Sequence, residues 1–330
     1  MLRDFAERQR IPFPLLSDVD SEVIRRYGVL NDQLDESDGM LYGIPYPGVF
    51  VTDEHGAVIT KIFHDSYKKR DSPELLIDAA LGRVQLDAAA PKATGGEPSV
   101  RITAAVHGGR GTIRQGIRRE LVVRFELDDG LHIYGEPVPD GMLATSVEVA
   151  GPPGLIVEEP ILPPTSALRL DELGVDLQVW SGVVDIRVPF YAVGELASEV
   201  RPLEAETASI EVTVRYQACD DRTCLLPKTE KLSLELPLDV IDVPAISLHT
   251  GHGQREGGYD GTPHLRRLLL RKLRRHPLGF LRFVAKSLRL EIAARRRGFA
   301  SRVAASEPGS AEPPTQGPGR GCGPGDGKSS

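Results

Sequence analysis

Between residues 100 and 240, short segments that alternate apolar and polar residues recur along the sequence. In residues 208–216, Ile210, Val212 and Val214 would share one face of a strand, while Glu211 and Thr213 would share the other. Similar stretches lie at 100–106, 119–127, 145–150, 182–190 and 231–238, separated by turn sequences such as DDG, PDG and GPPG. Many short alternating strands joined by tight turns are typical of a β-sandwich. We therefore expect a sandwich domain over residues 100–246.

Residues 1–82 have a different pattern, in which helices alternate with few strands. Residues 2–10 and 21–29 have helical character, and FPLLSD at 13–18 resembles a short strand. GVFVTD (48–53) and AVITKIF (57–63) flank EHG, which is a hairpin signature. SPELLIDAALG (72–82) begins with Ser-Pro and ends on Gly, as helices often do. This pattern predicts a separate α/β unit. The Ala-, Pro- and Gly-rich residues 83–99 are interpreted as a linker.

The C-terminal part of the chain is cationic although the whole chain carries a net charge of −7. We expect a Gly-rich linker at 247–263, basic amphipathic helices at 264–305 and a disordered tail at 306–330. The basic segment contains thirteen Lys or Arg and one acid, Glu291, while Leu281, Val284, Leu288 and Ile292 recur at helical spacing. Three interpretations stay open: binding to an anionic membrane surface, packing on the acidic body or a solvated helix, and, least favoured, nucleic-acid binding.

The sequence contains no apolar run long enough to cross a bilayer, and residues 1–20 lack the apolar region of a signal peptide. The sequence as written therefore predicts neither a transmembrane segment nor a signal peptide. We expect no cofactor and no metal site, and we do not expect the His residues at 249, 252 and 264 to bind a metal.

Two of the three cysteines, Cys219 and Cys224, lie in the stretch YQACDDRTC just after a predicted strand. The pair allows a structural disulfide, half of a metal site, or a redox pair. A disulfide that closes so short a loop stabilises the fold by only about 2 kcal/mol, because it removes little entropy from the unfolded chain. A structural zinc site needs four ligands, and the remaining cysteine, Cys322, lies in the tail. The position of both sulfurs at one hairpin end favours exchange with a partner thiol over the structural disulfide.

The stretch YQACDDRTCLLP resembles the active-site segment of the N-terminal domain of the thiol:disulfide interchange protein DsbD. DDGLHIYGEPVPDG (128–141) and DLQVWSGVVDIRVPF (176–190) are similar to other segments of that domain. The resemblance implies an immunoglobulin-like sandwich and an extracytoplasmic, periplasmic setting. It also implies that Cys224 forms the mixed disulfide with a thioredoxin-fold partner and that Cys219 resolves it. Tyr216 and Gln217 would orient a sulfur, or Tyr216 would belong to the core.

A second resemblance covers residues 1–82. FAERQRIPFPLLSDVDSEVIRRYGV followed by YGIPYPGVFVTDEHGAVITKIF is similar to the C-terminal portion of the peroxiredoxins, the alkyl hydroperoxide reductase and thiol-specific antioxidant proteins. The resemblance implies a partial thioredoxin-like fold in which Pro47 follows a cis peptide bond beside the reactive cysteine. Residues 1–218 contain no cysteine, so we expect no peroxidase activity from this chain.

Together these features predict a thiol-disulfide oxidoreductase of the peroxiredoxin-like plus DsbD-like type, which takes part in cell redox homeostasis through Cys219 and Cys224. The alternative is a non-enzymatic binding module with a structural disulfide and a vestigial thioredoxin-like domain. His132 and Trp180 are interpreted as structural residues of the sandwich.

Overall fold

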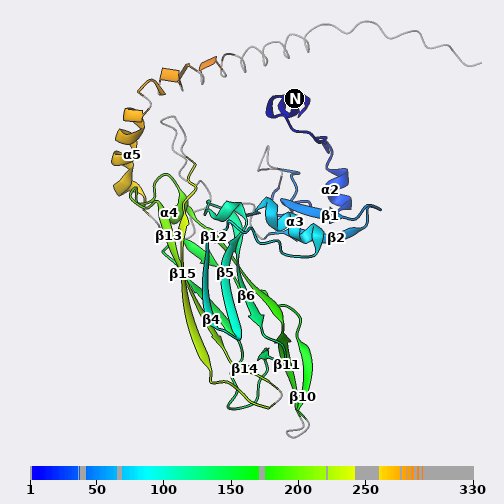
Figure 1. Cartoon of the computed structure of the whole chain (residues 1–330). Helices are drawn as coiled ribbons and strands as arrows, with labels where there is room; N and C mark the ends of the chain where they lie inside the picture. The colour runs from blue at the N-terminus through cyan, green and yellow to red at the C-terminus, as the bar shows by residue number, and fades with distance from the viewer. Residues whose placement is uncertain are drawn as a thin grey trace, which may run out of the picture.

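The computed structural model describes residues 2–35, 37, 42–64, 69–170, 175–220, 222–241 and 260–275, and ten further residues between 277 and 292. Its largest part is a long stack of antiparallel strands (Figure 1). These strands are β4 (Lys92–Glu97), β5 (Val100–His107), β6 (Ile117–Leu127), β7 (His132–Tyr134), β8 (Ser146–Ala150), β9 (Leu155–Val157), β10 (Ser166–Leu170), β11 (Val175–Ser181), β12 (Val183–Ala192), β13 (Thr207–Tyr216), β14 (Ala218–Cys219) and β15 (Lys228–Pro237).

Two of the sheets enclose the main core. One has the order β4-β5-β6-β12-β9 and the other β15-β13-β8. The alternation of the sequence explains this packing, because Ile210, Val212 and Val214 of β13 are fully buried while Glu211 is exposed. Their side chains join those of Phe125 and other strand residues in one apolar cluster. The predicted sandwich of the second region is consistent with this mostly β architecture.

A third sheet, β10-β11-β7-β14, lies at one end of the long stack (Figure 1). It has a small apolar cluster of its own, in which Tyr134, Leu177, Val179 and Cys219 are buried. The predicted cysteine hairpin therefore belongs to this end sheet, and its strand β14 pairs with β7.

The N-terminal unit consists of α1 (Leu2–Gln9), α2 (Glu22–Arg26), the hairpin β1 (Gly48–Thr52) and β2 (Val58–Phe63), β3 (Arg70–Asp71) and α3 (Pro73–Leu81). The predicted hairpin and the helix over 72–82 are confirmed. The strand expected at 13–18 does not form, because Phe13 and Leu16 are exposed to solvent and pair with no strand of the described chain. A complete thioredoxin-like arrangement is not confirmed, since β1 and β2 form a sheet of only two strands.

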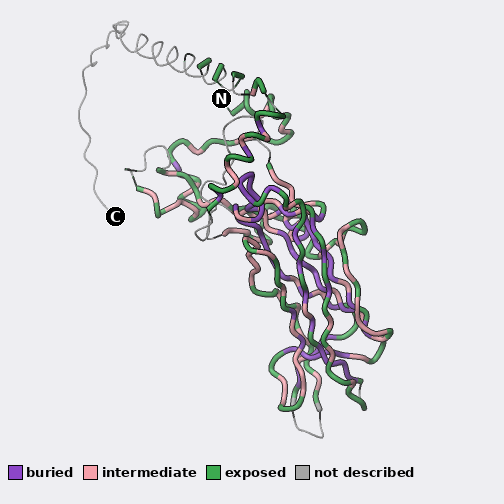
Figure 2. Tube along the Cα trace, turned by 90° about the vertical axis from the view of Figure 1, so that its left-hand side faces the viewer, coloured by how far each residue is buried: buried purple, intermediate pink, exposed green. Residues whose placement is uncertain are grey.

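Burial differs sharply between these two regions (Figure 2). Buried residues follow the strands of the sandwich, whereas the N-terminal unit is mostly exposed or intermediate. Among the described residues of 2–82, Leu75 is the only buried apolar side chain. The N-terminal unit therefore has almost no core of its own.

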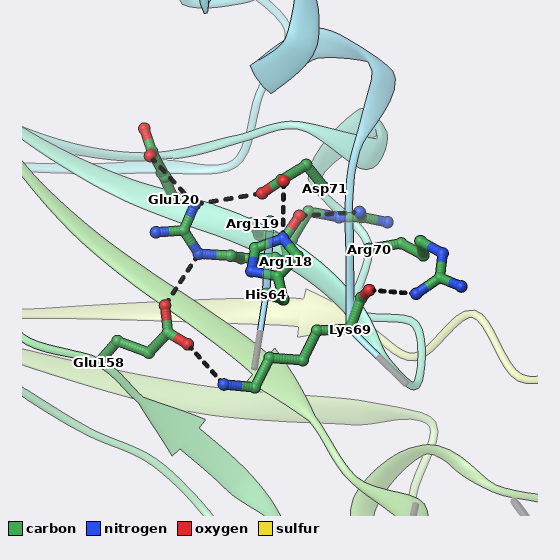
Figure 3. A network of polar contacts seen from close by, with 8 residues as sticks. All are labelled: His64, Lys69, Arg70, Asp71, Arg118, Arg119, Glu120 and Glu158. Carbon is green, nitrogen blue, oxygen red and sulfur yellow. Dashed lines mark hydrogen bonds and ion pairs between the residues drawn. The ribbon is translucent and has the colours of Figure 1, made fainter. Parts of the chain in front are cut away.

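Polar contacts join the N-terminal unit to the sandwich. Strand β3 runs parallel to β6, pairing Asp71 with Arg118. The Asp71 carboxylate contacts His64 at 2.8 Å and Arg118 at 3.1 Å, and Arg118 also contacts Glu158 at 2.8 Å (Figure 3). Lys69 forms a further ion pair with Glu158 at 3.3 Å. We call this set of five residues the junction.

The region expected to be a linker, 83–99, contributes a strand to the sandwich. β4 pairs along its full length with β5, from Lys92↔Ala105 to Glu97↔Val100. The two strands approach closely near the tip of this hairpin: Gly96, within β4, has a φ of 95°, and a Cβ there would lie 2.0 Å from the Val100 carbonyl oxygen. The linker prediction was wrong for 92–97, because an edge strand needs main-chain partners on one side and little apolar sequence.

The basic segment begins with helix α5 (Thr262–Arg275), and the described residues at 279, 281–282, 284–285, 288–289 and 292 are also helical. The expected tail at 306–330 and most of the Gly-rich linker lie outside the described residues. Within the described part of the chain, no helix is long and apolar enough to cross a membrane.

Candidate disulfide-exchange site

The two cysteines face each other across a tight turn and form a disulfide, with their Cα atoms 4.1 Å apart. The turn is held by the Asp220 carboxylate, which accepts hydrogen bonds from the backbone N–H groups of Arg222 at 2.7 Å and Thr223 at 2.6 Å. These hydrogen bonds lower the pKa of Asp220, so the carboxylate stays ionised and keeps the turn closed. The sequence DDRT therefore positions the pair through local backbone chemistry.

The two sulfurs occupy unlike environments. The side chain of Cys219 is 1% exposed and packs in the small apolar cluster of the end sheet beside Tyr134, Leu177 and Val179. Cys224, after the turn, is exposed to solvent. A partner in solution can therefore approach Cys224 and not Cys219.

Strand β7 places two polar side chains beside the pair. His132 is the register partner of Cys219, and the Tyr134 hydroxyl lies 3.7 Å from the Cys224 sulfur. The His132 Nε2 atom lies 3.3 Å from that hydroxyl. Burial raises the pKa of Tyr134, so its hydroxyl keeps its proton and can donate to the sulfur.

Sequence reasoning gave His132 a structural role and did not single out Tyr134. The available signal was their spacing: residues two apart on a strand share one face, and both belong to LHIYG. What the sequence could not show was that this face lies against the cysteine turn, because β7 and β14 are far apart along the chain.

Gln217 and Tyr216, predicted to support the pair, have different surroundings. The Gln217 side chain accepts a hydrogen bond from the Leu143 backbone N–H at 3.0 Å and donates one to the Leu225 carbonyl at 3.2 Å. It therefore ties the segment after Cys224 to the loop that follows β7. Gln217 thus orients the backbone around the pair without touching a sulfur.

Tyr216 belongs to the main core. Its ring packs edge-on against Phe125, with centroids 5.8 Å apart, and its buried hydroxyl has no hydrogen-bond partner in the described residues. Burial, together with Glu97 and Glu230, raises the pKa of Tyr216 to about 12. Of the two roles considered for this residue, the structure supports the core role, because the side chain points into the sandwich.

Pro47 does not join the site. It precedes β1 in the N-terminal unit, near the opposite end of the molecule from β14 (Figure 1). Within the described residues only the Glu136–Pro137 peptide bond is cis, so the expectation of a cis bond before Pro47 was wrong. Just before Pro47, Tyr46 donates its backbone N–H to the Val29 carbonyl at 2.7 Å.

Of the charged side chains near the cysteine pair in the sequence, one forms an ion pair with a more distant residue. Lys228, four residues after Cys224, forms an ion pair with Glu97 at 2.8 Å. Arg222 is exposed in the turn itself, and Asp221 lies outside the described residues. In the part of the chain that the structure describes, no group of three His, Cys, Asp or Glu residues is arranged to hold a metal ion.

Comparison with known families agrees with both sequence resemblances. Residues 110–236 match the family model of the thiol:disulfide interchange protein DsbD, N-terminal, and residues 1–61 match that of the AhpC/TSA family. The second domain is thus related in sequence to DsbD N-terminal domains and the first to AhpC/TSA proteins. No curated protein matches the chain as a whole or in part.

Solved structures give weaker similarity. They include the N-terminal periplasmic domain of ScsB from Proteus mirabilis, at 14% identity and a TM-score of 0.31 over 46% of this chain and 53% of that chain. The reduced DsbD N-terminal domain of Neisseria meningitidis gives 14% identity and a TM-score of 0.25 over 48% of this chain and 94% of that one. The Neisseria meningitidis complex between the DsbD N-terminal and PilB N-terminal domains gives 16% identity and a TM-score of 0.24, over 34% of this chain and 73% of that chain. This chain spans about half the length of the ScsB domain.

Proposed function

We propose that the chain is a thiol-disulfide exchange protein whose Cys219–Cys224 pair passes electrons to or from a partner. The observation that carries the proposal is the asymmetry of the disulfide. It presents an exposed sulfur, Cys224, at a hairpin tip and keeps the other, Cys219, in an apolar cluster. An exposed sulfur is the one that a partner thiolate can attack, and a buried one is protected from unwanted exchange.

In the proposed exchange, the exposed sulfur reacts first. A partner thiolate attacks Cys224 Sγ, the S–S bond breaks, and its electron pair leaves with Cys219, which takes up a proton. The partner is then joined to Cys224 by a mixed disulfide. A second thiolate of the partner attacks the partner's own sulfur in that bond and releases Cys224, which also takes up a proton. Two electrons and two protons enter the chain, and the partner becomes a disulfide.

The side chains of β7 assist the released Cys224. The Tyr134 hydroxyl, at 3.7 Å, is placed to donate a hydrogen bond to the sulfur when it carries negative charge. His132 lies behind this hydroxyl, where its ring nitrogen can exchange a proton with it. In the reverse direction, the same contact would favour Cys224 as the attacking thiolate.

The proposed partner is a thioredoxin-fold protein, and the proposed compartment is extracytoplasmic. Both follow from the match of residues 110–236 to the DsbD N-terminal family. The N-terminal unit, which matches AhpC/TSA proteins but contains no cysteine, takes no part in electron transfer in this proposal. We expect residues 1–218 to contribute no peroxide reduction, because that chemistry needs a thiolate.

A second function is favoured by one observation. Cys219 packs tightly among apolar side chains, as cysteines of structural disulfides often do. In this alternative, the pair only fixes the turn, and the domain serves as a binding module.

A redox titration separates the two functions. The full chain is equilibrated in glutathione or dithiothreitol buffers, free thiols are alkylated, and Cys219 and Cys224 are scored by peptide mass spectrometry. An exchange pair is expected to become reduced at a moderate potential, with both cysteines appearing together. A midpoint below about −300 mV is typical of a structural disulfide and would favour the binding module.

A further inference from the structure

Among the described residues, helix α5 packs against the sandwich through the face that carries Leu268. Leu268 is buried against Val200 and Leu203, and the Lys272 ammonium contacts Glu199 at 2.6 Å. Arg271 adds a hydrogen bond to the Leu203 carbonyl at 3.2 Å. These contacts fix the helix on the loop between α4 (Gly194–Ala197) and β13. The inner face of α5 is therefore occupied.

The outer face of α5 presents apolar and cationic side chains to solvent. Leu270 and Leu273 are each 46% exposed, and Arg266 and Arg274 are exposed beside them. At 3.6 residues per turn, Leu270 lies about 200° around the helix from the buried Leu268. The same kind of face continues beyond the helix in five exposed apolar side chains, those of Leu278, Leu281, Val284, Leu288 and Ile292.

A pocket lies beside this face, where α5 meets the loop before β13. It is formed by Leu203 and Leu270 together with the guanidinium-bearing side chains of Arg267, Arg271, Arg274 and Arg275. Arg267 is also paired with Glu204. Four cationic groups around two leucines form a surface that suits an anionic head group with an apolar chain attached.

We propose that the outer face of α5, continued by the exposed apolar residues of 278–292, binds the surface of an anionic lipid bilayer. Guanidinium groups pair with lipid phosphates, while leucines at the same depth enter the boundary between head groups and acyl chains. Charge complementarity favours an anionic membrane, because α5 carries Lys and Arg and no acidic residue, although the whole chain has a net charge of −7. The phosphates of a nucleic acid would pair with the arginines, but the exposed leucines would stay in contact with water.

The position of α5 gives this binding a consequence for the cysteine pair. α5 lies near one end of the long sandwich, and β14 with the cysteine hairpin lies near the other (Figure 1). Strand β6 has 11 residues, which corresponds to a length of about 36 Å. A chain bound through α5 would therefore hold Cys224 away from the lipid surface, open to a partner in solution.

The test is flotation of the full chain with vesicles of phosphatidylcholine alone or mixed with phosphatidylglycerol. We expect flotation only with the anionic vesicles, and we expect it to weaken as salt rises. The double substitution Arg266→Glu and Arg274→Glu should reduce the partition coefficient at least roughly tenfold, since each basic residue near an anionic surface contributes about a fivefold factor. Leu270→Asn with Leu273→Asn should reduce it by a similar factor.

The matched control is Arg83→Glu with Arg222→Glu, which makes the same change in charge at exposed positions away from α5. It should bind the anionic vesicles like the parent chain. Circular dichroism of every variant checks that the fold is kept, which we expect because none of the substituted side chains is buried.

Three binding results would overturn the proposal, and one result on self-association would do so as well. The binding results are equal flotation with neutral vesicles, equal loss in the control variant, and tighter binding to an RNA or DNA oligonucleotide than to anionic vesicles at the same salt concentration. Self-association that sediments without vesicles and vanishes in the α5 variants would also contradict it, by assigning this face to a second copy of the chain.

Discussion

In the sandwich, the ring of Phe125 is completely enclosed between two sheets, whereas in the N-terminal unit the ring of Phe50 is only partly buried. Phe50 has aromatic neighbours, with the ring centroids of Tyr27 at 5.4 Å and Phe63 at 5.1 Å. These three rings cover one side of the β1–β2 hairpin but form no closed interior. The same residue type therefore contributes to a core in one region and to a surface cluster in the other.

The comparison indicates that the two regions are stabilised differently. The sandwich buries two apolar faces against each other, which is the main source of folding free energy in a domain. The N-terminal unit relies on the junction of ion pairs and on the pairing of β3 with β6. Removing such charges from water costs free energy that their mutual attraction only partly returns, so these ion pairs add little net stability. The N-terminal unit therefore depends on the packed sandwich to hold it folded.

The largest effect is expected from separating the two regions. Residues 1–82 expressed alone should show little protection from amide hydrogen exchange, because they bury almost no apolar surface. Residues 92–241 alone should unfold cooperatively, since both sheets and the end sheet lie within them. Slow exchange in 48–63 of the isolated N-terminal fragment would show that this unit folds without the sandwich.

A matched pair of core substitutions measures the same difference at one residue type. Phe125→Ala should lower the free energy of unfolding of the sandwich by about 3–5 kcal/mol, because it leaves a cavity in a closed core. Phe50→Ala should leave the sandwich transition unchanged and cost no more than about 1 kcal/mol in the hairpin, the value of a side-chain pair on an open sheet face. Urea denaturation followed by circular dichroism and by Trp180 fluorescence gives the value for the sandwich, and amide hydrogen exchange in 48–63 gives the value for the hairpin. Equal losses from the two substitutions would contradict the difference in packing.

The junction should respond to pH and to one substitution. Burial alone would raise the pKa of Asp71, but its hydrogen bonds and the charges of His64 and Arg118 outweigh burial and lower it. The stabilisation is therefore complete above the unfolded pKa of Asp, about 3.9, and is lost as the pH falls through the depressed value. Asp71→Asn should cost roughly 2 kcal/mol of local stability at neutral pH, the value of a hydrogen bond to a charged group, and remove this acid dependence.

Amide exchange in Arg70–Leu81 measures that local stability. Asp128→Asn is the control, because Asp128 forms an exposed ion pair with Arg101 at 3.2 Å and should cost less than about 1 kcal/mol. A junction substitution that changes exchange no more than this control would show that the N-terminal unit is held by other contacts.

The smallest effect is expected at the cysteine turn. In a chain with Cys219→Ser and Cys322→Ser, Tyr134→Phe removes the hydroxyl beside Cys224 and should slow alkylation of Cys224 by iodoacetamide about fivefold, the value of one hydrogen bond. Tyr216→Phe is the control, since its buried hydroxyl faces the main core. An identical rate in both variants would remove Tyr134 from the mechanism.

Much of the sandwich was predictable from the sequence, because the alternation of apolar and polar residues can be recognised within a single strand. Such a strand buries its apolar face in the core. β13 illustrates this, since its four alternate residues from Ile210 to Tyr216 are buried as expected. β4 was missed because KATGGE has no such pattern and pairs through its main chain. The junction was not predictable, because Asp71 and Arg118 are 47 residues apart and meet only through a parallel strand pair.

The candidate site was also only partly predictable. The turn and its two cysteines could be found from YQACDDRTC, since spacing and turn chemistry are local. The burial of Cys219 and the approach of Tyr134 depend on how β7 and β11 pack around β14, which no local pattern encodes.

The entry of a partner through Cys224 is tested by comparing two single-thiol chains. Each carries Cys322→Ser together with either Cys219→Ser or Cys224→Ser. Both are mixed with a single-cysteine thioredoxin activated as a mixed disulfide with thionitrobenzoate, and the released thionitrobenzoate is followed by absorbance. The chain that retains Cys224 should displace it and form the covalent complex at least roughly tenfold faster, because Cys219 is buried. Equal rates, or faster reaction through Cys219, would show that the partner does not enter through Cys224.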